Sequence, residues 1–325
     1  MRLSALPIKM NLQTKISLQP QKFNQIDYNS KILLLGSCFS ENIGKKFSYF
    51  KFQSTVNPLG ILFHPLAIEN LITRAINKDY YLDSDLTYNN EQWSCLDAHS
   101  KLNNASKEVL LTELNIEIDN THQQLKDATH VVITLGTSWV YRHIASDVIV
   151  ANCHKLPQKQ FLKELLSIEQ IAESLDAVFS LIKSVNPKVS VLFTVSPVRH
   201  IKDGFIENTR SKSHLLAAIH QVVEPRKQSH YFPSYEIMMD ELRDYRFYNI
   251  DMLHPSMLAV DYIWKKFKMV WFSEDALKIS ETVESIQTKK AHRPFNSSSE
   301  AHQQFLKKLQ SEIDDLSVQY PHIFF

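Results

Sequence analysis

Two short segments, far apart in the sequence, carry side chains that are suited to nucleophilic chemistry. Ser37 and Cys38 follow the turn at the end of an apolar run, Ile32 to Leu35. Much later, Asp251 precedes His254 by three residues. A histidine that is oriented by a carboxylate can take the proton of a thiol or hydroxyl and so activate it as a nucleophile. We therefore expect nucleophilic chemistry, with Cys38 or Ser37 as the nucleophile and the later pair as the base.

The segment around Cys38 predicts the strand and the helix that position this nucleophile. The run from Ile32 to Leu35 does not alternate with polar residues, which is typical of a parallel strand covered on both faces. Gly36 permits a sharp turn, and we expect Ser40 to cap a helix that runs to about Phe50. Cys38 would lie just before the positive end of that helix, where a thiolate is favoured. The alternative is that Cys38 is only a small buried hydrophobic residue.

Apolar strands and amphipathic helices alternate along most of the chain. Five main strands are expected, over residues 31–35, 51–56, 130–135, 189–195 and 231–238. Their alternation with helices predicts a parallel sheet with right-handed crossovers. The predicted fold class is therefore α/β, a three-layer α/β/α sandwich around a five-stranded parallel sheet.

The helices and irregular segments suggest one large domain with a helical extension. Helices are expected from Pro65, over 106–126, from the capping box of Ser167 and Gln170, over 211–223 and after Pro255. Residues 1–30 are expected to form an extended lead-in, 78–105 an inserted loop or hairpin, and 145–163 an irregular segment. From about residue 273 the sequence is charge-rich and helical, with a second helix at 299–316. We expect an α/β domain at 1–272 and a C-terminal helical extension at 273–325.

The composition indicates a folded protein without a strong overall charge. Of its 325 residues, 44% are hydrophobic, and 36 Lys and Arg balance 35 Asp and Glu to a net charge of +1. This balance provides no field that would recruit nucleic acid or an anionic membrane. The three cysteines, Cys38, Cys95 and Cys153, are odd in number and lack CxxC spacing, which argues against a disulfide framework. Without a signal-peptide core or a long apolar run, we expect a soluble cytoplasmic protein, and the sequence does not predict its oligomeric state.

Further polar residues follow other predicted strands and should reach the same edge of the sheet. The turn from Asn57 to Gly60 follows the second strand, and Ser138 follows the third. The carboxyl ends of parallel strands share one edge, where open α/β sheets bind ligands. We therefore expect Ser138, Asp251 and His254 to lie near the nucleophile, and a family resemblance implies the same for Asn57 and Gly60.

These segments resemble a known family. The run Gly36-Ser37-Cys38-Phe39-Ser40 looks like the signature of the GSCFA family, which is grouped with the SGNH (GDSL-type) hydrolases. Segments similar to the SGNH blocks Gly-Asp-Ser, Gly, Gly-x-Asn and Asp-x-x-His occur in that order at residues 36–38, 57–60, 136–138 and 251–254. The resemblance covers about residues 10–272. It implies a flavodoxin-like fold and an esterase, deacylase or acyltransferase.

Two positions depart from the SGNH pattern. Cys38 stands at the position of the nucleophilic serine, with Ser37 at the aspartate position, and Ser138 replaces the asparagine. The resemblance implies that Cys38 attacks a carbonyl and that His254 transfers the proton. It also implies an oxyanion held by the amides of Cys38 and Gly60 together with Ser138. Whether Cys38 or Ser37 attacks stays open, as does the choice between water and a hydroxyl or amine as acceptor.

The expected partner is a small-molecule or glycan acyl ester, and no cofactor is expected unless a coenzyme A thioester is the acyl donor. Arg199 and His200 belong to a basic group after the fourth strand that also contains Lys202, Arg210 and Lys212. Such a group would hold a phosphate or carboxylate of the substrate or of coenzyme A. The alternative for this group is a solvated basic loop.

Two alternatives to this chemistry remain. His99 and His154, with Cys38 and Cys153, would make a metal site of mixed sulfur and nitrogen ligands. No ligand-spacing motif supports such a site, so no metal is expected. The other alternative is a non-catalytic ligand-binding module on an SGNH scaffold. Retention of the aspartate and histidine favours the enzyme, because a passive pocket needs neither.

Overall fold

The centre of the molecule is a five-stranded parallel sheet. In the computed structural model, which describes residues 13–325, its strands are β1 (Lys31–Gly36), β2 (Gln53–Val56), β5 (His130–Leu135), β9 (Ser190–Val195) and β10 (Ser229–Tyr231). They lie in the order β10-β9-β5-β1-β2, and every neighbouring pair is parallel. The prediction of an α/β fold with five parallel strands is confirmed.

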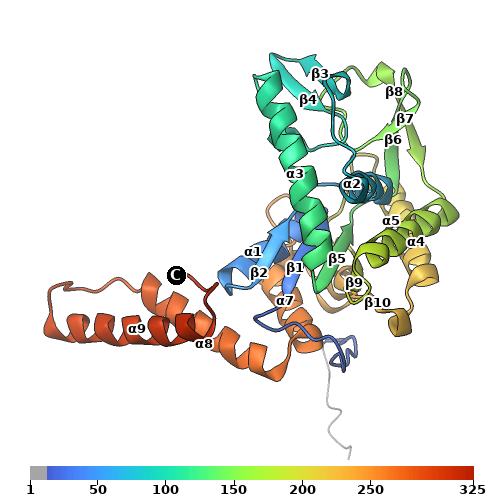
Figure 1. Cartoon of the computed structure of the whole chain (residues 1–325). Coiled ribbons are helices and arrows are strands. Elements are labelled where there is room, and N and C mark those ends of the chain that lie inside the picture. Colours follow the sequence, from blue (N-terminus) through green and yellow to red (C-terminus); the bar gives the residue numbers. More distant parts are fainter. Residues whose placement is uncertain (1–12) are drawn as a thin grey trace, which may run out of the picture.

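Helices cover both faces of this sheet (Figure 1). One face carries α2 (Pro65–Asn77), α3 (Lys107–Asp127), α4 (Ile168–Val185) and α5 (Phe205–Val222). The other face carries α1 (Cys38–Tyr49) and α7 (Met257–Trp271). The sheet is therefore the middle layer of a three-layer α/β/α sandwich, as predicted.

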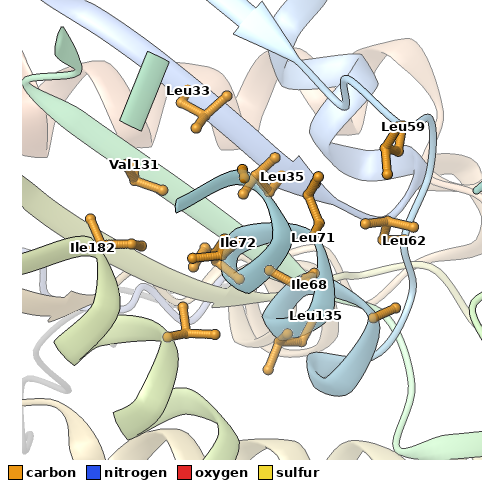
Figure 2. Close-up of a cluster of buried hydrophobic side chains, with 14 of the residues drawn as sticks. Leu33, Leu35, Leu59, Leu62, Ile68, Leu71, Ile72, Val131, Leu135 and Ile182 are labelled. Atoms are coloured by element: carbon orange, nitrogen blue, oxygen red, sulfur yellow. The ribbon is translucent and has the colours of Figure 1, made fainter. Parts of the chain in front are cut away.

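Successive residues of β1 pack into opposite cores. Leu33 and Leu35 lie in the core beneath α2, where Figure 2 shows Leu35 beside Leu71. Ile32 and Leu34 lie in the core on the face of α1 and α7. All four strand residues are at most 1% exposed. Burial on both faces explains why this strand has no polar alternation in its sequence.

The C-terminal helices continue the core on the side of α1. The helices α8 (Glu274–Ala291) and α9 (Glu300–Gln319) contact each other and project from the sandwich as an arm (Figure 1). Val283 and Ile286 of α8 are fully buried in the same hydrophobic cluster as Phe47 of α1. The predicted helical character of the C-terminal region is confirmed, and apolar packing joins it to the sheet domain.

Two small antiparallel sheets are inserted between the main elements. The strands β3 (Leu86–Asn89) and β4 (Gln92–Cys95) form a hairpin, in agreement with the prediction for residues 78–105. The strands β6 (Trp139–His143), β7 (Val148–Val150) and β8 (Phe161–Leu165) form a separate sheet. The expectation of irregular structure at 145–163 therefore holds for residues 151–157 and is wrong for β7 and the start of β8. These strands are only three to five residues long, so their sequence gives a weak periodic signal.

Two further element boundaries differ from the prediction. Strand β10 ends at Tyr231, and the chain then forms α6 (Ser234–Glu236) and a π-helical turn (Ile237–Glu241). The predicted strand over 231–238 is therefore wrong. Its apolar residues are buried, as the pattern suggests, but in a helical segment. Helix α5 also begins earlier than predicted, at Phe205 instead of residue 211.

The segment before β1 runs along the outside of α7. Ile26 forms a parallel bridge with Phe272, and Tyr28 is buried. The part of the lead-in prediction that falls on residues 1–12 lies outside the described residues. Across residues 13–325, no helix has both the length and the apolar character needed to cross a membrane.

Candidate functional site

The turn after β1 is fixed by its contact with β5. Gly36 has a φ of +130°, and a Cβ at this position would overlap the carbonyl group of Thr134 in β5. The next amide, that of Ser37, donates a hydrogen bond to the same carbonyl oxygen at 3.0 Å. Only glycine meets both conditions without strain. The contact places Ser37 and Cys38 at the carboxyl end of the sheet.

Helix α1 is capped by Ser37 and not by Ser40. The Oγ of Ser37 accepts a hydrogen bond from the amide of Phe39 at 3.3 Å, and Ser37 is fully buried. The hydroxyl of Ser40 donates instead to the carbonyl oxygen of Leu35. The predicted cap was therefore wrong by one turn of helix. Cys38 is the first helical residue, where the amide N–H has no acceptor within the helix.

The turn after β2 lies against the turn after β1. Asn57 has a φ of +46°, and its Oδ1 accepts the amide of Gly36 at 2.8 Å. The Nδ2 of Asn57 is buried and has no hydrogen-bond partner within residues 13–325. The amide of Gly60 donates to the carbonyl oxygen of Asn57 at 2.8 Å. Of these two predicted site residues, Asn57 keeps a free donor and Gly60 does not.

Asp251 and His254 form a hydrogen-bonded pair on the turn before α7. The Oδ2 of Asp251 lies 2.6 Å from Nδ1 of His254, and its Oδ1 accepts the amides of Leu253 and His254. The amides of His254 and Leu253, followed by the His254 ring, lower the pKa of Asp251 to about 2. The carboxylate is therefore ionised at neutral pH. It holds Nδ1 and leaves Nε2 of His254 available for a reacting proton.

A buried lysine lies at the same edge of the sheet. Lys212 of α5 is 1% exposed, and its Nζ donates to the carbonyl oxygens of Gly136 and Ser196 at 2.7 and 2.8 Å. These carbonyls directly follow β5 and β9. Burial lowers the pKa of Lys212 to about 7, and a negative charge on Cys38 opposes this effect. Lys212 is therefore not part of a solvated basic loop. Such a loop was the alternative for the basic group that follows the fourth predicted strand.

His200 is electrostatically linked to both Lys212 and His254. Its ring packs edge-on against Phe63, with 5.5 Å between ring centroids, and its Nε2 is buried without a partner in the described chain. Burial, followed by the positive charges of Lys212 and His254, lowers the pKa of His200 to about 3. His200 is therefore neutral at neutral pH, and its imidazole is close enough to sense both charges.

The environment of Cys38 differs from the sequence expectation. Burial is the largest influence and raises the pKa of the Cys38 thiol. The charge of Lys212 and the amides of Cys38 and Phe39 lower this pKa, whereas Glu41 raises it, and the net effect is an increase. The expectation that the helix terminus favours a thiolate is therefore wrong, because the helix amides do not offset burial. A nucleophilic role for Cys38 would therefore require a base.

The hydroxyl of Ser138 is committed to helix α5. Ser138 is fully buried, and its Oγ donates a hydrogen bond at 3.1 Å to Ser211, the residue before Lys212. The amide of Ser138 donates to the Oγ of Ser211 at 2.8 Å. A serine hydroxyl has a single proton, so this one is not free for an oxyanion. Ser138 instead helps to anchor α5 beside Lys212.

Comparison with known families supports the resemblance seen in the sequence. A family model described as "GSCFA family" matches residues 31–267, from the start of β1 into α7. The chain belongs to the GSCFA family. A second model, described as "GSCFA domain protein, C-terminal domain", matches residues 283–325, which include the second half of α8 and all of α9. No curated protein sequence matches the chain.

Each residue of the GSCFA signature has a distinct place in the turn. Gly36 permits the contact with β5, and Ser37 caps the helix. Phe39 is 2% exposed and fills the core beneath α1. Ser40 bonds back to the end of β1. Cys38 is the only one of the five that is partly exposed.

The basic cluster predicted after the fourth strand divides among three environments in this GSCFA protein. Arg210 lies 3.8 Å from Glu207 and more than half of its side chain is exposed. Lys202 donates a hydrogen bond to the hydroxyl of Tyr141. Arg199 faces a hollow next to the turn of Asp251. The cluster is therefore not one anion site.

The metal site considered from the sequence does not form in the described part of the chain. The Nε2 of His154 bonds to the carbonyl oxygens of Cys95 and Ala98 at 2.7 and 3.1 Å. The Nδ1 of His99 accepts the amide of Lys101. Within residues 13–325, no group of three or more His, Cys, Asp or Glu side chains is arranged to hold a metal ion.

The raised pKa of Cys38 predicts how its alkylation depends on pH. Iodoacetamide reacts with the thiolate, so labelling of Cys38 in the folded protein should reach half of its maximal rate at a higher pH than labelling of an ordinary thiol. The same peptide in the denatured chain should titrate near the ordinary value. Peptide mapping by mass spectrometry measures both. A midpoint below about pH 8 in the folded protein would contradict the burial argument, since free thiols titrate near 8.5.

Proposed function

We propose that this GSCFA protein catalyses acyl transfer through a covalent thioester at Cys38. The observation that carries the proposal is the pairing of Asp251 with His254 at 2.6 Å. An ionised carboxylate that orients a histidine supplies a base and an acid for nucleophilic catalysis. A passive pocket would need neither residue. The proposed substrates are small-molecule or glycan acyl esters or thioesters, which makes the protein an esterase, a deacylase or an acyltransferase.

In the first half-reaction, Nε2 of His254 takes the proton of the Cys38 thiol while the sulfur attacks the carbonyl carbon. A carbon–sulfur bond forms, and the electron pair of the carbonyl π bond moves to the oxygen. When this intermediate collapses, the bond to the leaving alcohol or thiol breaks, and His254 returns the proton to the leaving group. The raised pKa of Cys38 fits this order, because the thiol keeps its proton until the base removes it.

In the second half-reaction, an acceptor releases the acyl group from Cys38. His254 takes a proton from water, a sugar hydroxyl or an amine while that group attacks the thioester. Collapse of the second intermediate expels the Cys38 sulfur, which recovers its proton from His254. Water as acceptor gives hydrolysis, and the other two acceptors give acyl transfer. A coenzyme A thioester is a suitable acyl donor in either case.

Two uncommitted donors are proposed to hold the oxyanion. The amide of Cys38 lies in the first turn of α1, and Nδ2 of Asn57 is buried without a partner in the described residues. The donors suggested by the family resemblance, the amide of Gly60 and the hydroxyl of Ser138, bond elsewhere. A donor that is fixed before the reaction stabilises developing charge most effectively. Asn57 meets this condition, because the amide of Gly36 already holds its Oδ1.

Lys212 is proposed to stabilise the sulfur when it becomes negative. Two backbone carbonyls fix its Nζ, and among charged groups it has the largest effect on the pKa of Cys38. A cation in a low-dielectric site acts strongly on a neighbouring charge. Lys212 would thereby compensate in part for the burial of the thiol.

A second candidate function is ligand binding without catalysis. It is favoured by the raised pKa of Cys38, which leaves the side chain a neutral thiol at neutral pH. In that case the aspartate and histidine would hold the loop before α7, and no covalent intermediate would form.

The choice of nucleophile is tested by turnover of p-nitrophenyl esters and acyl-coenzyme A substrates. Cys38→Ala should abolish turnover, and Cys153→Ala, the matched control at another partly buried thiol, should leave it unchanged. Ser37→Ala should lower the free energy of unfolding by about 1 kcal/mol through loss of the helix cap and should retain turnover. Loss in Ser37→Ala with retention in Cys38→Ala would make the serine the nucleophile. Turnover that neither change affects would exclude both residues as the nucleophile, and absence of turnover in the wild type would favour the binding module.

The proposed oxyanion donor is tested by Asn57→Asp. This change keeps an oxygen that can accept the Gly36 amide but removes the Nδ2 donor. We expect kcat to fall at least about 10²- to 10³-fold, the usual loss for one oxyanion donor. The buried carboxylate should also lower the melting temperature, so circular dichroism checks that the variant is folded. Asn57→Ala removes both interactions and should also destabilise the turn. Full kcat in Asn57→Asp would exclude Asn57 from the oxyanion site.

A further inference from the structure

A hollow of about 680 Å³ opens beside the turn that carries the proposed catalytic histidine. Its wall includes Asp251 and Leu253 of that turn and apolar side chains such as Met238 and Leu242. Phe205, at the start of α5, is 58% exposed at its edge. The volume and the mainly apolar lining are typical of a site for a small molecule.

Four charged side chains line this hollow, and three of them pair with other side chains of the protein. These pairs are Arg243 with Asp240, Asp244 with Arg246, and Asp251 with His254. The fourth is Arg199, for which no ion pair occurs within residues 13–325. Arg199 is therefore the charge that remains for a ligand.

The position of Arg199 is fixed by its backbone and its side chain. Its amide donates to the carbonyl oxygen of Leu253 at 3.1 Å, so it is tied to the turn of the catalytic pair. The nearest acceptor of its guanidinium is the Sδ of Met239 at 3.0 Å. A thioether is a weak acceptor, so most of the five N–H donors are unused. A planar guanidinium in such surroundings matches a carboxylate or a phosphate.

Two other cations of the basic group after the fourth strand, Lys202 and Lys212, are not placed to bind an anion in this hollow. Lys212 is buried and its Nζ is held by two backbone carbonyls. Lys202 lines a separate hollow next to Trp139 and Tyr141. The anion in the first hollow would therefore be recognised by Arg199.

We propose that Arg199 binds a carboxylate or phosphate carried by the acyl substrate, whose hydrocarbon part packs in the hollow beside Asp251. Assignment of this anion to a substrate rests on the proposed acyl transfer. The shared chemistry is an apolar chain with one anionic group. If Arg199 binds this anion, a substrate with an anionic group is preferred over a neutral acyl ester.

The proposal is tested by isothermal titration calorimetry with hexanoate, hexyl phosphate and the neutral control hexanol. The full chain should bind at least one of the two anions about 10-fold or more tightly than hexanol, and the tighter anion identifies the group. Arg199→Met should weaken that binding at least about 10-fold. Arg243→Met, at an arginine of the same hollow that already pairs with Asp240, should change it less than about twofold.

Three results would overturn the proposal: equal binding of hexanol and both anions, unchanged anion binding in Arg199→Met, or no anion binding to the full chain. Circular dichroism checks the fold of each variant. If Arg199→Met does not fold, Arg199→Lys decides, because it keeps the charge but loses the bidentate geometry and should bind the anion more weakly than the wild type. Unchanged binding in Arg199→Lys would contradict bidentate recognition. The titration measures binding and does not depend on turnover. A negative titration would therefore not contradict the acyl-transfer proposal, and a negative turnover assay would not contradict anion binding by Arg199.

Discussion

The close approach of β1 to β5 at Gly36 is the constraint on which the candidate site depends. A side chain here would overlap the carbonyl of Thr134, and the amide of Ser37 bonds to the same oxygen. The chain can leave the sheet in this direction only through a residue without a Cβ. The start of α1 and the position of Cys38 follow from this contact. Asn57 adds a second contact at this point. Its Oδ1 accepts a hydrogen bond from the Gly36 amide, which ties the turn after β2 to the turn after β1.

Burial dominates the electrostatics at this edge of the sheet. At Cys38 it raises the pKa of the thiol in spite of the helix amides and Lys212. At Lys212 it lowers the pKa to about 7 although two carbonyls accept its protons. Burial therefore disfavours an ion pair between the Cys38 thiolate and the Lys212 ammonium before substrate is attacked. In the proposed mechanism charge develops only when substrate is attacked, which is why the histidine oriented by Asp251 is essential to the account.

Local patterns could be predicted from the sequence, and long-range partners could not. The run Ile32–Leu35 marks a doubly covered strand because burial on both faces removes polar alternation. The predicted strand over 231–238 failed because burial alone does not separate strand from helix. Asp251 and His254 lie on one turn, so their spacing was informative. Lys212 was missed as a site residue, because its carbonyl partners lie 76 and 16 positions away in the sequence.

The central claim is that Cys38 carries the acyl group during the reaction. Rapid quenching of the full chain with p-nitrophenyl acetate, followed by intact-mass measurement and peptide mapping, tests it most directly. The account predicts one acetyl group per chain, located on the Cys38 sulfur by fragmentation of the peptide that contains both Ser37 and Cys38, and none in Cys38→Ala. An acetyl group on Ser37, or continued turnover without any acylated peptide, would contradict it.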